Sequence, residues 1–190
     1  MGANSTKSNH EPQSAVCYEY LVSKMQSGEL VGGMSVTEQG LADELGISRT
    51  PAREALRRLE VDGLVVSEPR FGMKVKELGY TETLELYEAR EALEMAAVEI
   101  CAEKISDIEI AELEILQEQM AGSVRDPIRM ASLNYAFHKA LLNAAKNRYL
   151  TMSFEAIHKT LAILGSTTLT NTERAEESLI EHQDLIRCLK

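Results

Sequence analysis

The chain has 190 residues, of which 44% are hydrophobic and 26% are charged, and its formal net charge is −10. This composition is ordinary for a globular protein of one or two domains. No apolar run approaches the ~18 residues that a membrane span requires, and the N-terminal residues lack the apolar core of a secretory signal. Three widely spaced cysteines form no CxxC pair, so we expect reduced thiols in a cytoplasmic protein with no membrane partner.

The negative charge lies almost entirely in the second half of the chain. Residues 1–76 contain nine Lys/Arg and ten Asp/Glu, a net charge of −1, while residues 77–190 contain eleven and twenty, a net charge of −9. Residues 48–58 contain four arginines and one acid, which gives a local charge of +3. Because the local field governs contact with phosphate, the total charge does not exclude DNA as a partner.

The polar N-terminal residues 1–14 are typical of a disordered tail. Apolar side chains at helical spacing then predict a helix over residues 15–27, which ends at Gly28. Thr37 has the chemistry of an N-cap, and the short helix that it begins ends at Gly46.

A second helix follows directly, and the pair predicts a helix-turn-helix. Ser48 is expected to cap this helix, Pro51 is tolerated in its first turn, and the helix runs to about Asp62. The connection over residues 45–48 has the length of the turn in a helix-turn-helix.

The two faces of this second helix differ in chemistry. At about 100° per residue, one sector is apolar and is expected to be buried; its members are Ala52, Ala55, Leu56 and Leu59. Arg49, Arg53 and Arg57 follow one flank, where guanidinium groups suit phosphate or the O6/N7 edge of guanine. The alternative is a solvated face, for which only Glu54 and Glu60 are expected to neutralise the arginines.

A β-hairpin is predicted after this helix. Residues 64–67 and 73–76 have strand character and flank a turn with Pro and Gly, with Arg70 at the tip. A basic hairpin next to a recognition helix suits a wing that contacts the minor groove or the phosphate backbone.

These residues carry a resemblance to the DNA-binding domain of the GntR family of bacterial regulators. The resemblance covers about residues 18–76, and the string SRTPAREALRRLEVDGLV over residues 48–65 is its most specific part. It implies a winged helix-turn-helix over residues 15–77 that acts as a homodimer on palindromic operator DNA. The DNA-contacting positions that we carry over or infer are Gln39, Ser48, Arg49, Thr50, Arg53, Arg57, Arg70 and Gly72.

Residues 78–190 have an almost wholly helical pattern. Helices are expected over about residues 84–104, 106–120, 127–145, 147–164 and 172–189, and their amphipathic stripes predict an antiparallel all-α bundle. Asn134 and His138 share one helix face, and His182 lies on a later helix. From spacing alone, such residues are more often ordinary polar side chains than metal ligands.

Residues 86–94, 134–150 and 181–186 resemble the FCD effector-binding domain of the FadR-type branch of the family. The resemblance implies a Zn or Ni ion held by an Asp and three His, with a small carboxylate effector beside it. His138 and His182 match two of the histidines, and Asn134 replaces the Asp with a weaker neutral oxygen ligand. Arg90 is the expected effector-binding residue.

The family pattern continues beyond Lys190 with one more helix that carries the last His, a difference of some 20–40 residues by rough comparison. We therefore expect a cavity with one open side and a metal site short of one ligand. His158 is a possible substitute ligand, but an ordinary surface or core histidine is the favoured interpretation.

The sequence features bear on three classes of function. The sequence favours a DNA-binding regulator, most often a repressor, whose operator affinity is set by a small organic acid. An alternative is a truncated regulator whose helical domain only dimerises. A metal-dependent hydrolase using His138 and His182 is not expected, because no nucleophile motif, Gly-rich phosphate loop or HExxH is present.

Overall fold

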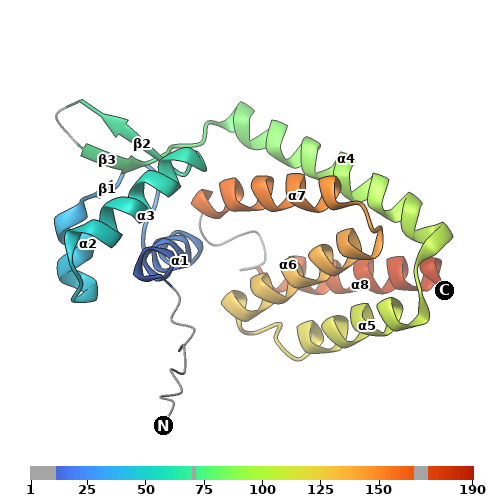
Figure 1. The fold of residues 1–190 in the computed structure, drawn as a ribbon. Helices are drawn as coiled ribbons and strands as arrows, with labels where there is room; N and C mark the ends of the chain where they lie inside the picture. The colour runs from blue at the N-terminus through green and yellow to red at the C-terminus, as the bar shows by residue number, and fades with distance from the viewer. Residues whose placement is uncertain (1–11, 70–71, 165–170) are drawn as a thin grey trace, which may run out of the picture.

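The computed structural model describes residues 12–69, 72–164 and 171–190. Three helices and a small sheet form an N-terminal unit, and a bundle of longer helices lies beside it (Figure 1). The N-terminal elements are α1 Gln13–Gln26, β1 Ser35–Val36, α2 Glu38–Leu45, α3 Arg49–Val61, β2 Val65–Glu68 and β3 Gly72–Val75. The winged helix-turn-helix expected from the sequence is therefore confirmed.

The helix ends follow the expected chemistry with two differences. The helix α1 begins at Gln13, two residues earlier than expected, and the rest of the expected disordered tail, residues 1–11, lies outside the described residues. Thr37 caps α2 by accepting a 3.0 Å hydrogen bond from the Gly40 amide, and Gly46 ends it with a φ of 65°. Ser48 occupies the N-cap position of α3, but its side chain makes no capping hydrogen bond, contrary to the expectation.

The sheet has a strand that the sequence analysis did not predict. Its order is β1-β3-β2, and both pairs are antiparallel, with Val65 opposite Val75 and Ser35 opposite Lys74. The extra strand β1 has only two residues, too few to show the alternation by which strands are recognised.

The C-terminal bundle confirms the all-α expectation. Its elements are α4 Tyr80–Lys104, α5 Asp107–Ala121, α6 Pro127–Ala144, α7 Arg148–Leu161, the 3-10 turn η1 Ala162–Leu164 and α8 Thr172–Leu189. Polar side chains cap the helices that follow α4: Ser106 and Glu109 form a reciprocal capping box, and Asp126 accepts from the Arg129 amide. The fourth expected helix thus ends three residues early and tightens into η1.

Two hydrophobic cores hold the chain together. The first surrounds Tyr18, Leu56 and Leu59 in the N-terminal unit, and the second surrounds Phe137 and Phe154 in the bundle. Cys17 and Cys101 are buried free thiols, and Cys188 is an exposed one. Across the described ranges, no helix combines the length and apolarity that a membrane crossing needs.

Candidate DNA-binding surface and internal cavity

The recognition helix α3 buries the apolar face predicted from the sequence. Ala52, Ala55, Leu56 and Leu59 are at most 2% exposed. The predicted contact residues Ser48, Arg49, Thr50, Arg53 and Arg57 are all exposed. The buried stripe fixes the rotation of α3 about its axis, so the arginine flank is held toward solvent.

Glu38 is a partner of the predicted contact arginines that the sequence analysis missed. It begins α2, and its carboxylate accepts from Arg53 Nε at 2.9 Å and Nη2 at 3.2 Å, and from Arg49 Nη2 at 3.3 Å. The hydrogen bond from Arg53 lowers the pKa of the Glu38 carboxyl, so this group stays ionised at neutral pH. The expectation that only acids on α3 could neutralise the arginines is therefore wrong.

The two paired arginines remain accessible to a nucleic acid. The side chains of Arg49 and Arg53 are 59% and 50% exposed, and that of Glu38 is 29% exposed. An exposed ion pair is worth about 0–1 kcal/mol, so phosphate or guanine can displace it. Glu38 therefore holds the guanidinium groups in place in the free protein without burying them.

The other arginines of α3 divide into two kinds. Among the described residues, Arg57 has no ion pair, so its guanidinium faces solvent freely. Arg58 turns the other way and stacks over the Tyr18 ring, with Cζ 4.2 Å from the ring centroid. Arg58 is also exposed, but its guanidinium is engaged with α1 and does not follow the flank of Arg49, Arg53 and Arg57.

The wing and the first turn of α2 contain the remaining residues predicted to contact DNA. Gly72 has a φ of 78°, which an L side chain rarely adopts, and an added Cβ would meet nothing within 4 Å. Gln39 is exposed and donates to Asp43 Oδ1 at 2.7 Å. Arg70, the predicted wing tip, lies outside the described residues.

The bundle contains a large cavity that brings together the predicted metal and effector residues. Its volume is about 1380 Å³, and Arg90, Asn134, His138, His158 and His182 all line it. This volume exceeds the ~300–1,000 Å³ usual for small-molecule sites.

The two predicted histidine ligands face each other in this cavity. Nε2 of His138 and Nε2 of His182 lie 3.3 Å apart. Burial lowers the pKa of His182 to about 3, aided by the neighbouring His138, so this imidazole is neutral at physiological pH. Nδ1 of each ring is buried without a hydrogen-bond partner among the described residues.

A carboxylate on α4 stands behind the histidine pair. Glu94 Oε2 lies 3.2 Å from His138 Nδ1, an ion-pair distance without hydrogen-bond geometry, and Arg90 Nε donates to Glu94 Oε1 at 2.6 Å. Burial alone would raise the pKa of the Glu94 carboxyl, but His138 and Arg90 outweigh it and bring the pKa to about 2. Glu94 is therefore an ionised group next to His138 Nδ1, and the sequence analysis did not single it out.

The donor set fits only part of the metal site that the FCD resemblance implies. The two nitrogens, 3.3 Å apart, lie close enough together that both could bind one ion at the ~2.1 Å zinc–nitrogen distance. The Ser178 hydroxyl donates to Asn134 Oδ1 at 3.4 Å, and this amide oxygen would be a neutral metal ligand. Within the described ranges, no group of three or more His, Cys, Asp or Glu is placed to hold a metal ion.

His158 also lines the cavity, in an aromatic stack instead of the histidine pair. Its ring lies 3.8 Å from the Tyr135 ring, centroid to centroid. Burial lowers the pKa of His158 to about 4, with further lowering by Arg90 and His138. This placement favours the expectation of a packed histidine over that of a substitute metal ligand.

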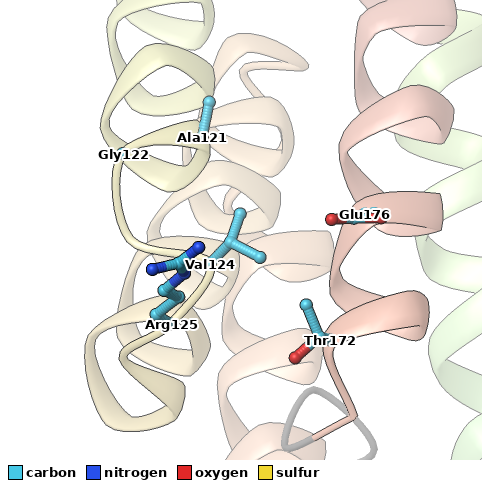
Figure 2. A pocket seen from close by; sticks show the side chains of 6 residues that line it. All are labelled: Ala121, Gly122, Val124, Arg125, Thr172 and Glu176. Carbon is cyan, nitrogen blue, oxygen red and sulfur yellow. The ribbon is translucent and has the colours of Figure 1, made fainter.

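A second cavity, of about 550 Å³, lies where the turn between α5 and α6 meets the start of α8 (Figure 2). Its side chains include Val124, Arg125, Thr172 and Glu176. None of the predicted site residues lines it, so it is separate from the candidate site.

Two family models match the chain. The model described as "Bacterial regulatory proteins, gntR family" matches residues 13–75, and the model described as "FCD domain" matches residues 85–190. The two matches correspond to the winged helix-turn-helix and to the helical bundle.

Relatives and solved structures agree with these matches. The chain is 30% identical to the Bacillus subtilis "Uncharacterized HTH-type transcriptional regulator YdhC" over 91% of this chain and 79% of that protein. It is 27% identical to the Paenarthrobacter nicotinovorans "Probable D-xylose utilization operon transcriptional repressor" over 100% of this chain and 84% of that protein. The structure of E. coli McbR/YncC, at 23% identity, superposes with a TM-score of 0.80 over 95% of this chain and 87% of that one, which shows a shared fold.

Proposed function

The chain belongs to the GntR family of bacterial transcriptional regulators and carries an FCD domain, and we propose that it is a cytoplasmic repressor that binds palindromic operator DNA as a homodimer. GntR regulators bind DNA and typically act as dimers. Its relatives and its fold are those of regulators and not of enzymes, and we propose no catalytic activity.

One observation carries this proposal: α3 presents Arg49, Arg53 and Arg57 to solvent along one flank while its apolar face is locked in the core. A helix in the major groove reads bases through its first turns. Guanidinium groups in that place can bond guanine O6 and N7 in a bidentate manner, whereas the same groups further along contact phosphate. Ser48, Thr50, Gln39 and the Gly72 backbone complete the proposed surface.

The test is a selection of binding sites from a pool of random duplex DNA with the full chain. We expect enrichment of a palindrome with two half-sites about one helical turn apart. Sedimentation of the complex should give two chains per duplex. Enrichment of a single half-site, or of no sequence, would contradict a dimer on a palindrome.

We further propose that a small carboxylate effector binds in the 1380 Å³ cavity next to Arg90. Arg90 has donors beyond the Nε that bonds Glu94, and it stands beside the histidine pair. Thermal shift against hydroxy acids and dicarboxylic acids tests this proposal, because a ligand that binds only the folded state raises the melting temperature. The shift should be lost in Arg90→Gln.

The charge of the cavity favours the alternative that the helical domain only dimerises. Glu88, Glu91 and Glu99 line the cavity, and none has an ion pair with any described residue. These carboxylates oppose a free anion. If no acid in the panel shifts the melting temperature, with or without metal, the alternative is supported.

A divalent ion at His138, His182 and Asn134 would offset this charge. When bound, it would supply the positive charge that attracts a carboxylate. With two strong donors and one amide, we expect weak binding of Zn or Ni. Metal analysis of gently purified protein tests for a bound ion, and zinc titration of the wild type and of His138→Ala measures the affinity. Equal zinc affinity of the two proteins would reject these ligands.

A further inference from the structure

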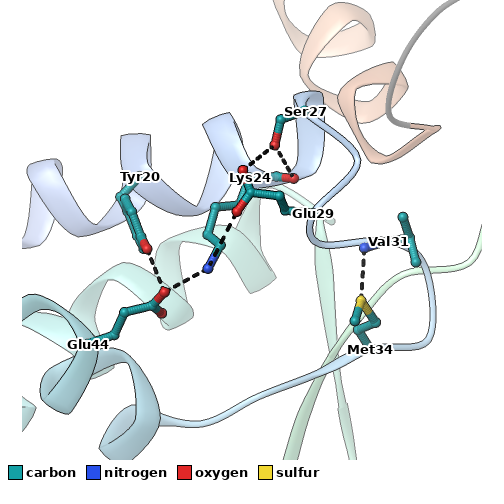
Figure 3. Close-up of polar contacts among 7 residues, drawn as sticks. All are labelled: Tyr20, Lys24, Ser27, Glu29, Val31, Met34 and Glu44. Carbon is teal, nitrogen blue, oxygen red and sulfur yellow. Dashed lines mark hydrogen bonds and ion pairs between the residues drawn. The ribbon is translucent and has the colours of Figure 1, made fainter.

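The large cavity has a wall that belongs to the N-terminal unit. The end of α1 lines it together with η1, and the lining residues from α1 and the turn after it are Ser23, Gln26, Ser27 and Glu29. Figure 3 shows this end of α1, where Lys24 Nζ and Tyr20 Oη both donate to Glu44 of α2, at 2.7 and 2.6 Å. The helix that walls the cavity is therefore bonded directly to the first helix of the helix-turn-helix.

We call residues 158–164, which comprise the last turn of α7 and η1, the connecting segment. This segment has two faces. Toward the cavity it presents His158, Leu161, Ala162 and Leu164. Its Ile163 is 3% exposed and belongs to the hydrophobic core of the N-terminal unit, not to that of the bundle. The side chains of neighbouring residues thus reach two different compartments.

The polar side of the connecting segment reaches the end of the recognition helix. Lys159 Nζ lies 3.9 Å from Asp62 Oδ2 and 5.8 Å from the centroid of the Tyr18 ring. Tyr18 donates to the same Asp62 oxygen at 2.5 Å, and Arg58 of α3 covers its ring. Asp62 is the C-cap residue of α3, so Lys159 contacts the point where α3 ends and α1 packs against it.

We propose that the connecting segment transmits the state of the cavity to α1 and α3. A ligand that displaces His158 or Leu161 from the cavity wall must shift Lys159 and Ile163 on the same short segment. Because packed interfaces change between discrete arrangements, such a shift alters the orientation of α3 relative to the bundle. This inference rests on the proposed function, since it takes the cavity as the ligand site and α3 as the DNA-contacting helix.

Hydrogen exchange of the full chain, without DNA or ligand, tests the contact itself. In Lys159→Ala, amides of residues 13–26 and 58–64 should exchange at least about threefold faster than in the wild type, because a tether on these helices is lost. The matched control is Lys190→Ala, which removes a lysine paired at 2.6 Å with Glu114, a residue of the bundle itself. Ile163→Ala should have a larger effect, and Ile163→Val keeps the test valid if Ile163→Ala fails to fold.

Transmission from the cavity face is tested separately. His158→Ala removes the ring stacked on Tyr135, whereas His158→Phe keeps a ring of similar size. His158→Ala should accelerate exchange in residues 58–64, and His158→Phe should not. Unchanged exchange in His158→Ala, or the same exchange in Lys159→Ala and Lys190→Ala, overturns the proposal.

Operator binding supplies the functional readout. Lys159→Ala should change the operator Kd by about threefold, within the range of one exposed ion pair, although Lys159 lies outside the proposed DNA surface. An unchanged Kd in both Lys159→Ala and Ile163→Ala also overturns the proposal. If no operator is found, the proposed function fails, but the exchange experiments still decide whether the connecting segment couples the two units.

Discussion

Replacing Arg53 with Ala tests base contact by the recognition helix more sharply than any other single change. Arg53 is half exposed, and its only ion pair among the described residues is with Glu38. Loss of an exposed pair costs the fold about 0–1 kcal/mol, so the melting temperature should hardly change. Loss of a base contact costs about 1–3 kcal/mol of binding free energy, which corresponds to a rise in Kd of about 5- to 150-fold.

Glu38 adds a second contribution to this loss. Without Arg53, its carboxylate loses its bidentate partner and faces the phosphates with only the 3.3 Å contact to Arg49. We therefore expect Arg53→Ala to fall in the upper part of the range. The double variant Arg53→Ala/Glu38→Ala should recover part of the affinity, which is the signature of coupled residues.

The assay is fluorescence anisotropy of a labelled operator at fixed salt, with a scrambled duplex as the reference for specificity. Arg187→Ala is the matched control, because it removes an exposed arginine paired with Asp184 at 3.0 Å at the far end of α8. Equal operator binding by Arg53→Ala and Arg187→Ala would refute a base contact by Arg53.

Three further predictions follow from the same geometry. Glu38→Gln should bind scrambled DNA more tightly, because a repulsive charge is removed. In the same assay its preference for the operator over scrambled DNA should fall about fivefold. An unchanged preference would show that Glu38 does not position the arginines. Arg57→Ala should lower the slope of log Kd against log salt concentration by about one without changing the base preference, because it removes a phosphate contact. An altered base preference in a repeated selection would instead show that Arg57 contacts a base. Leu59→Ala should lower the free energy of unfolding, measured in urea, by about 2–5 kcal/mol. Val61→Ala changes a side chain that is 86% exposed and should change the free energy of unfolding by no more than about 0.5 kcal/mol. Equal losses would contradict the assigned faces of α3.

The helix-turn-helix could be predicted in detail because its signals are local. The apolar spacing of α3 is visible within a few turns, and Thr37 and Gly46 mark the ends of α2 by their own chemistry. The same holds for the capped helices of the bundle. The strand β1 could not be predicted, because two residues acquire strand geometry only from their partner β3.

The missed site residues depend on contacts that are distant in sequence. Glu38 meets Arg53 across the turn between α2 and α3, 15 residues away. Glu94 meets His138 between α4 and α6. Neither pairing leaves a periodic trace in the sequence, so the sequence indicated the arginines and histidines but not the carboxylates that lie next to them.

The contact of the connecting segment with α1 is equally invisible in the sequence. Ile163 continues an amphipathic pattern that suits the bundle, yet it packs in the other core. Ile163 lies in η1, where the chain no longer follows the α-helix of α7. The sequence therefore predicts two units but not the surface by which they touch.

Methylation interference at guanine N7 tests the central claim most directly, because N7 lies in the major groove and is an acceptor for arginine. N7 methylation of one guanine in each half-site should block binding by the wild-type chain, and Arg53→Ala, or Arg49→Ala, should lose sensitivity at that guanine alone. Binding that tolerates N7 methylation throughout the selected operator would contradict the insertion of α3 into the major groove.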